Sequence, residues 1–245
     1  MKRIIAVLLA AGATAAVAAP SGRSVREATG LYDFDYSYPA AASAIAGLRA
    51  SLDADLARRL AVLQKDAREG QAEAKAGGFP FNKYYWSQSW RVVTDLPGWL
   101  SLSAAYGNYT GGAHGMSWSG AMLWDRKANR ARNPLDLFAG KAALAAAIRA
   151  PFCAALDRQR AEKRGEPVRR GSGDDFDRCI DPTEQTVILG SRGHKAFDRI
   201  GILVAPYSAG PYAEGAYEVT VPVTPAVIAA VRPAFRGSFA VLRQE

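Results

Sequence analysis

A single histidine between glycines is the residue best placed to do chemistry in this sequence. His114 lies in the string YTGGAHG, residues 109–115, between two stretches that alternate like strands. Glycines at a hairpin turn permit positive φ angles and close backbone approach. The imidazole is expected either to hydrogen-bond the backbone and fix the turn, or to contact a ligand. The glycines expected to shape the turn are Gly111, Gly112 and Gly115.

Two tyrosines form a second candidate binding element. Tyr207 and Tyr212 flank the string SAGP on a predicted loop between strands. Aromatic faces on a loop can stack on a sugar, and loops held by a rigid sheet often carry binding residues. The alternative is that both rings cap the core, with their hydroxyls in solvent. Together with His114 and Tyr109, these tyrosines are the candidate ligand-binding residues.

Known catalytic motifs are missing from the sequence. It contains no Walker A string, no G-x-S-x-G and no H-E-x-x-H. With only two histidines, a multi-histidine metal centre is not available. We therefore assign no catalytic residue, no metal and no cofactor. The alternative is a cell-wall hydrolase or esterase of unrecognised type, in which His114 acts with Asp125 or Asp136.

The two cysteines are predicted to form a disulfide. Cys153 and Cys179 enclose a charged, glycine-rich segment that would otherwise be a floppy loop. A redox-active or metal-binding pair would call for C-x-x-C spacing or a nearby histidine. Basic residues crowd this segment and are expected to be a solvated surface, with an anion-binding patch as the alternative. They are Arg158, Arg160, Lys163, Arg164, Arg169 and Arg170.

The beginning of the sequence resembles a secretory signal peptide. Lys2 and Arg3 precede an apolar stretch, and small residues precede a cleavage site expected after Ala18. Residues 19–30 are then expected to be a linker. No later segment approaches the roughly 20 apolar residues of a membrane span. Because richness in alanine, glycine and arginine is typical of some bacteria, we expect the mature protein in the periplasm, where a disulfide can form.

Hydrophobic periodicity predicts an α+β fold. Aromatic residues alternate with polar ones over 31–38, which indicates a strand. Leucines at spacings of three and four predict a long amphipathic helix over 41–76, which Gly77 and Gly78 should end. Three further strands, an antiparallel meander with one apolar face against this helix, are expected around 84–92, 100–106 and 116–124. The tryptophans expected in its core are Trp86, Trp90, Trp118 and Trp124.

The pattern of apolar residues in the second half of the chain predicts another helix and another set of strands. Apolar residues at four-residue spacing indicate a helix over 141–163. Strands are expected at 186–189, 200–204 and 217–223, and a short helix at 225–231. The fold class is therefore α+β, in which antiparallel sheets pack with a long N-terminal helix and a second helix in the C-terminal half.

Two blocks of sequence resemble a known family. The string YTGGAHG with NPLDLF at 133–138, and the string ILVAPYSAGPYAEG at 202–215, are similar to the signatures of the RsiV/PdaC-like family of exported bacterial domains. The resemblance implies a PdaC-like strand-helix-meander part at 31–125 and an RsiV-like helix-sheet part at 126–245. One relative senses lysozyme by binding it, and another accompanies an enzyme that acts on cell-wall glycan. Recognition in the cell envelope is therefore the implied role.

Charge favours some partners over others. Loss of Lys2 and Arg3 with the signal peptide lowers the formal net charge from +8 to 29 minus 23, or +6, which would repel a basic lysozyme at long range and suits an anionic envelope polymer. We expect a non-catalytic binding protein for a peptidoglycan-type glycan or a lysozyme-like protein, and no nucleic acid, because no binding fold for it is recognised. A purely structural role is a further alternative. The sequence does not set the oligomeric state.

Overall fold

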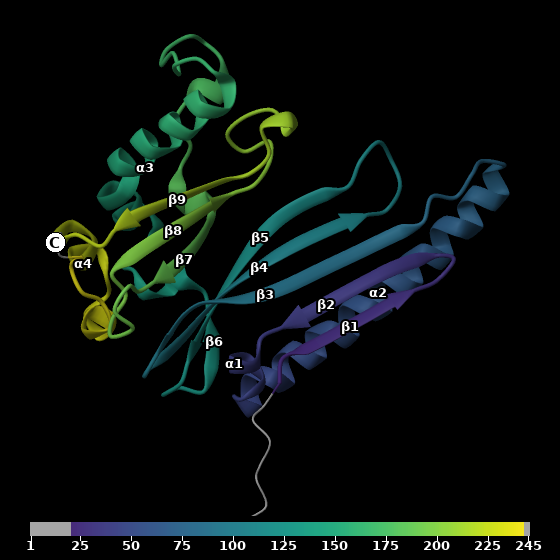
Figure 1. The fold of residues 1–245 in the computed structure, drawn as a ribbon, viewed down its shortest axis with the longest axis horizontal. Coiled ribbons are helices and arrows are strands. Elements are labelled where there is room, and N and C mark those ends of the chain that lie inside the picture. The colour runs from purple at the N-terminus through teal and green to yellow at the C-terminus, as the bar shows by residue number, and fades with distance from the viewer. Residues whose placement is uncertain (1–20, 243–245) are drawn as a thin grey trace, which may run out of the picture.

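The computed structural model describes residues 21–242, so the expected signal peptide lies outside the described residues. The fold is α+β, as predicted, and contains two sheets (Figure 1). The larger sheet has the order β1-β2-β3-β4-β5-β6. Its strands are β1 (Arg23–Ala28), β2 (Tyr32–Tyr38), β3 (Tyr84–Leu96), β4 (Trp99–Tyr109), β5 (Met116–Asp125) and β6 (Arg130–Arg132).

The first strand corrects the expected linker. Residues 23–28 form β1, which pairs antiparallel with β2 along its whole length. An ion pair between Arg26 and Asp35 at 2.7 Å joins the two strands. The string RSVREA has little apolar alternation, so its strand character comes from backbone hydrogen bonds to the edge of β2 rather than from burial of its side chains.

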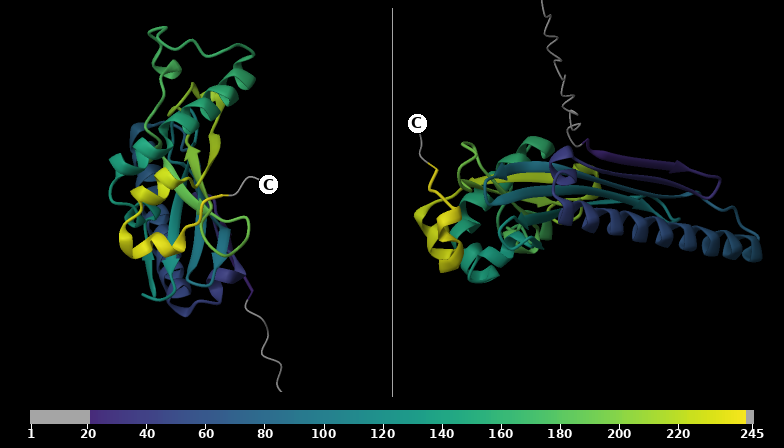
Figure 2. Two further views of the ribbon diagram at one scale, coloured as in Figure 1. Left: turned by 90° about the vertical axis from the view of Figure 1, so that its left-hand side faces the viewer. Right: turned by 90° about the horizontal axis from the view of Figure 1, so that it is seen from below.

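A long helix covers one face of the large sheet. β2 and β3 pair in parallel, and a parallel pair requires a crossover, which α1 (Ala40–Ser43) and α2 (Ala46–Gly77) supply. α2 runs along the sheet (Figure 2) and ends where predicted, with Gly78 in the left-handed conformation at φ 68°. Its buried leucines pack on the four aromatic side chains of β2. These aromatics are Tyr32, Phe34, Tyr36 and Tyr38.

The predicted meander is present as β3, β4 and β5. The two hairpins pair antiparallel, and they turn at 97–98 and at 110–115. Of the tryptophans expected in the core, Trp90 and Trp124 are buried. Trp86 and Trp118 are half-buried and pack edge to face on each other. The side chains of the meander therefore become more exposed towards the end of the sheet where His114 lies.

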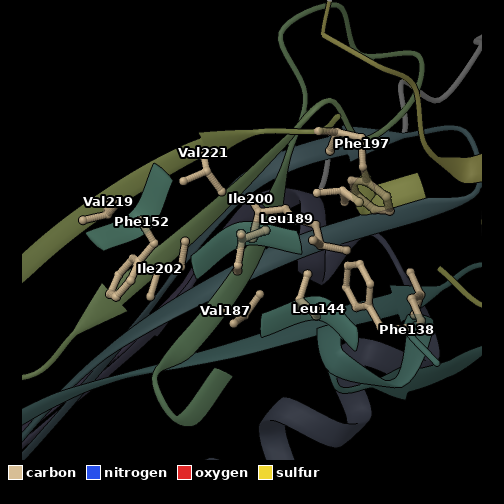
Figure 3. Packing of buried hydrophobic residues seen from close by; sticks show 14 of the residues in the cluster. Phe138, Leu144, Phe152, Val187, Leu189, Phe197, Ile200, Ile202, Val219 and Val221 are labelled. Carbon is tan, nitrogen blue, oxygen red and sulfur yellow. The ribbon is translucent and has the colours of Figure 1, made fainter. Parts of the chain in front are cut away.

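The second half of the chain packs a helix on a small sheet. β7, β8 and β9 pair antiparallel in that order, and α3 covers their apolar face (Figure 3). Leu96, Trp99 and Leu123 from the large sheet belong to the same core, so the two sheets pack together. The bounds are α3 (Lys141–Arg164), β7 (Thr186–Gly190), β8 (Arg199–Val204), β9 (Tyr217–Pro222) and α4 (Pro225–Ala230).

Short 3-10 helices lie in the connections and fix their ends. The first of them begins with a capping box. The Asn133 side chain accepts the backbone N–H of Leu135, and the Asp136 side chain accepts the backbone N–H of Asn133. The boundary expected near residue 125 falls just before β6, which still belongs to the large sheet. Among residues 21–242, no helix is long and apolar enough to cross a membrane. The 3-10 helices are Pro134–Leu137, Asp175–Asp177, Pro182–Glu184, Tyr212–Glu214 and Pro233–Ser238.

Candidate functional site

Three aromatic side chains from two distant loops meet in one cluster. The ring of His114, on the turn between β4 and β5, stacks on Tyr212 with centroids 4.5 Å apart and planes 26° apart. The ring of Tyr207 lies 5.3 Å from Tyr212 and 6.3 Å from His114. We call these three residues the aromatic cluster. It unites three of the four ligand-binding candidates taken from the sequence.

The hairpin turn gives His114 its position. Gly111 and Gly112 have φ angles of 94° and 99°, which side chains rarely adopt. A Cβ on Gly115 would meet the hydroxyl of Tyr85 and the carbonyl of Asn108, so the backbone passes close to both neighbouring strands at this point. Tyr109 donates its hydroxyl to the Gly112 carbonyl at 2.9 Å. Tyr109 therefore supports the turn and stacks on Tyr85 at 6.2 Å rather than on the aromatic cluster.

Both nitrogens of His114 have partners. Nδ1 lies 2.9 Å from the carbonyl of Gly115, and because a carbonyl only accepts, Nδ1 must carry the proton. In a neutral ring, Nε2 is then an acceptor, 3.4 Å from the hydroxyl of Tyr207. The Tyr212 hydroxyl also donates to the Gly115 carbonyl at 3.3 Å. His114 thus fixes the turn and at the same time presents its ring at the surface.

The two tyrosines are exposed and do not cap the core. Tyr207 is 47% exposed and Tyr212 is 40% exposed. Both lie on the segment between β8 and β9, residues 205–216, which we call the tyrosine loop (Figure 1). Tyr207 has a positive φ of 67°, a conformation that costs a non-glycine residue about 1–2 kcal/mol. Strained backbone positions cluster at binding and active sites, where the surrounding structure holds them in place.

The last turn of α3 anchors the tyrosine loop. Lys163 donates to the carbonyls of Glu214 and Ala216, both at 2.6 Å. Arg164 forms an ion pair with Glu214 at 2.8 Å, and their side chains are only 16% and 12% exposed. Arg160 donates to the Ala209 carbonyl at 2.8 Å. Three basic side chains of α3 therefore hold the tyrosine loop from behind, in addition to the contacts that Tyr207 and Tyr212 make with the turn of His114.

The anchoring is reflected in the pKa of the groups around Glu214. Burial acts to raise the pKa of this carboxyl, but hydrogen bonds from Arg164 and Tyr217 outweigh it and lower the pKa below its usual value. Burial, together with the hydrogen bond to Glu214, raises the pKa of the Tyr217 hydroxyl to about 12. Glu214 is therefore a charged, hydrogen-bonded carboxylate at neutral pH, suited to holding the loop.

The expectation of a solvated basic patch is wrong for two of its residues. Arg160 is fully buried, and its guanidinium donates to the Arg178 carbonyl at 3.0 Å and to Asp157 at 3.3 Å. Arg164 pairs with Asp177 at 2.8 Å in addition to Glu214. A run of basic residues on a helix does not show which of its members face carboxylates from other elements, so the sequence could not separate these roles.

The predicted disulfide is present. It joins Cys153 in α3 to Cys179, with Cα atoms 5.5 Å apart. Residues 165–180, which we call the charged loop, are thus attached to α3 covalently at Cys179 and ionically at Asp177. Through Arg160 and Arg164, α3 connects the charged loop to the tyrosine loop.

The proposed acidic partners of His114 lie elsewhere. Asp125 is the last residue of β5, and a strand of that length places it about 30 Å from the turn that carries His114. Asp125 instead pairs with Arg132 at 2.8 Å. Asp136 caps the first 3-10 helix through the backbone N–H of Asn133, beyond β6 at the same far end. A hydrolase built on either pairing is not compatible with this arrangement.

Sequence reasoning missed the residues that support the cluster. Tyr85, exposed beside Tyr109, shares the alternation of β3 with residues on the polar face and carries no motif of its own. The spacing of Arg160, Lys163 and Arg164 is a usable signal, because residues three and four apart lie on one face of a helix. Among residues 21–242, no group of three or more His, Cys, Asp and Glu side chains is arranged to hold a metal ion.

Fold and site together define an α+β protein in which a helix-backed meander and a second helix-covered sheet join their loops in one exposed aromatic cluster. Residues 25–117 match the family described as deacetylase PdaC. This match includes the turn that carries His114 and ends before the tyrosine loop. No curated protein matches the sequence.

Solved structures extend the likeness over most of the chain. A DUF3298 family member from Bacteroides fragilis superposes with a TM-score of 0.53 at 18% identity, over 82% of this chain and 89% of that one. A DUF3298 family protein from Pseudomonas aeruginosa superposes with a TM-score of 0.50 at 17% identity, over 90% and 96%. These likenesses establish the shared fold. The resemblance inferred from the sequence is confirmed: the chain is PdaC-like in its N-terminal part and has the fold of DUF3298 proteins.

Proposed function

We propose that this chain is an exported binding protein that recognises a cell-envelope glycan through the aromatic cluster. The observation that carries the proposal is the stacking of His114, Tyr207 and Tyr212, which two loops bring together at the surface. A sugar ring has an apolar C–H face and polar edges. It therefore fits exposed aromatic rings that carry hydroxyl groups at their rims.

The surroundings of the cluster favour recognition over turnover. The hydrogen-bonding partners of His114 are a backbone carbonyl and a tyrosine hydroxyl, and neither carries the negative charge with which a carboxylate stabilises the imidazolium of a general base. The tyrosine loop and the charged loop are held by partly buried ion pairs, and a preorganised surface loses less entropy when a ligand binds. The description of the matched family names a deacetylase; for this chain we propose recognition alone.

A sedimentation assay with insoluble peptidoglycan tests the proposal. The wild-type protein should sediment with the polymer, and the double variant Tyr207→Ala/Tyr212→Ala should lose at least about tenfold in apparent affinity, since stacked rings contribute about 0.5–1.5 kcal/mol each beyond the area they bury. Phe79→Ala is the matched control, because Phe79 is 58% exposed but lies outside the cluster.

Additional experiments distinguish a glycan from the alternative ligands and from a substrate. Binding that disappears at about 0.5 M salt would identify an anionic polymer attracted by net charge instead of a stacked sugar. Retention on immobilised lysozyme, without retention on peptidoglycan, would overturn the proposal in favour of a protein partner. Release of sugar or acetate by the wild type but not by His114→Ala would favour the hydrolase.

Export is part of the same proposal. It is supported by the apolar stretch before Ala18 and by the Cys153–Cys179 disulfide, because disulfides persist in oxidising compartments. Fractionation of bacteria that express the full chain should recover the protein in the periplasmic fraction, shortened by its first 18 residues. Recovery of the full-length chain in the cytoplasm would contradict it.

A further inference from the structure

A hollow adjoins the aromatic cluster on the side of the charged loop. Its volume is about 600 Å³, and it lies between residues 174–180 and the start of the tyrosine loop. Tyr207 lines the hollow and also belongs to the cluster. The two features therefore form one continuous surface. Pockets that hold small ligands typically measure about 300–1,000 Å³.

The walls of the hollow are held from behind. Cys179, in one wall, is bonded to Cys153 of α3. The neighbouring Arg178 accepts a hydrogen bond from Arg160 at its carbonyl. On the opposite wall, Arg160 also binds the Ala209 carbonyl, next to Ser208. One buried arginine thus spaces the two walls, so the hollow is a built feature and not a gap between two free loops.

The lining of the hollow suits a sugar unit with substituents. Phe176 and Ile180 are half-buried and offer apolar surface beside the ring of Tyr207. Polar groups lie around them, among them the Ser208 hydroxyl and the ion pair of Arg178 with Asp175 at 2.9 Å. A mixed lining of this kind can bury the C–H face and acyl groups of a sugar while its hydroxyls find hydrogen-bonding partners.

We propose that the hollow is a second subsite, which binds the next sugar unit of a glycan whose first unit stacks on the aromatic cluster. The protein would then recognise an oligosaccharide rather than a single sugar. This inference rests on the proposed function. Because the two subsites share Tyr207, a chain held at the cluster presents its neighbouring unit to the hollow at high effective concentration, and affinity rises with chain length.

Titration calorimetry with N-acetylglucosamine, its dimer and its tetramer tests the inference. We expect the tetramer to bind the wild type at least about tenfold more tightly than the monomer does. Phe176→Ala should remove most of this gain, so that the tetramer binds little more tightly than the monomer. Ser208→Trp, which fills the hollow, should act in the same way and covers the case that Phe176→Ala does not fold. Tyr212→Ala should weaken the binding of ligands of every length, and Phe79→Ala should weaken the binding of none of them.

The outcomes distinguish the subsite from the function on which it rests. If all lengths bind equally and neither hollow variant matters, while Tyr212→Ala still weakens binding, the subsite is overturned and the proposed function stands. If no length binds, or if binding is indifferent to Tyr212→Ala, both are overturned. A gain with chain length that survives both Phe176→Ala and Ser208→Trp places the second unit elsewhere and also overturns the subsite.

Discussion

Arg164 and Glu214 form an ion pair at 2.8 Å across 50 positions of the chain, and their side chains are 16% and 12% exposed. The same guanidinium pairs with Asp177 at 2.8 Å. One side chain at the end of α3 therefore ties the tyrosine loop to the charged loop. Because these two loops line the hollow and carry two rings of the cluster, the shape of the candidate site depends on this contact.

Replacing Arg164 should loosen both loops at once. Arg164→Met leaves two carboxylates without their partner in a partly buried setting, and we expect it to lower the free energy of unfolding by about 2 kcal/mol. Urea denaturation measures this change. Glycan affinity should fall as well, although Arg164 lies behind the cluster. A variant as stable as the wild type would contradict the anchoring role.

Lys65→Met is the matched control for this variant. Lys65 pairs with Glu69 at 2.9 Å, but the side chains are 65% and 58% exposed. Because exposed ion pairs contribute little, this substitution should leave the urea midpoint and the glycan affinity almost unchanged. Equal losses in both variants would show that charge in general, and not the tie between the loops, stabilises the protein.

Acid should weaken the anchor of the tyrosine loop. Because the hydrogen bonds of Arg164 and Tyr217 hold the pKa of Glu214 below its usual value against the effect of burial, the carboxylate stabilises the fold above the unfolded pKa of about 4.3. That contribution is lost as the pH falls through the lower folded pKa. Glu214→Gln should therefore be less stable than the wild type near neutral pH, and the difference should shrink at acidic pH.

A set of denaturation curves at several pH values measures this difference. Glu218→Gln is the control, because Glu218 is exposed on β9 and has no ion pair among the described residues. It should follow the wild type throughout. A stability difference between Glu214→Gln and the wild type that is constant with pH would mean that shape, and not charge, makes Glu214 necessary.

The disulfide should contribute a large share of stability. Cys153 and Cys179 are 26 positions apart, and closing a loop of that length stabilises a protein by roughly 3–4 kcal/mol on the chain-entropy estimate. The double variant Cys153→Ser/Cys179→Ser should therefore melt roughly 10 °C lower. A reducing agent should shift the wild type by the same amount and leave the variant unaffected. No shift on reduction would mean that the thiols are unpaired in solution.

Most helices and strands were predictable because their side chains alternate between core and solvent. The aromatics of β2 and the leucines of α2 repeat with the periods of a strand and a helix. β1 could not be found in this way, since the backbone of RSVREA pairs with a sheet edge while most of its side chains remain in solvent. Periodicity reports burial, and an edge strand can form without it.

The candidate site was predictable in its parts but not in its assembly. Glycines around His114 and tyrosines around a short loop are local signals of turns and exposed rings. That Tyr207 reaches His114 across 93 positions depends on how the small sheet packs on the large one. The carboxylates considered for His114 failed for a different reason: the extended strand β5 places Asp125 at its opposite end, and Asp136 follows beyond β6.

The backbone conformation of Tyr207 should lower the stability of the fold, a cost that keeps the aromatic ring in the cluster. Its φ of 67° is accessible to glycine without strain, whereas alanine keeps the strain and loses the ring. Tyr207→Gly should therefore be about 1 kcal/mol more stable than Tyr207→Ala in urea denaturation, a difference that the greater flexibility of glycine in the unfolded chain reduces. Both variants should lose glycan affinity equally. If Tyr207→Ala is the more stable of the two, the backbone at this position is not strained in solution and the argument from strain to binding fails.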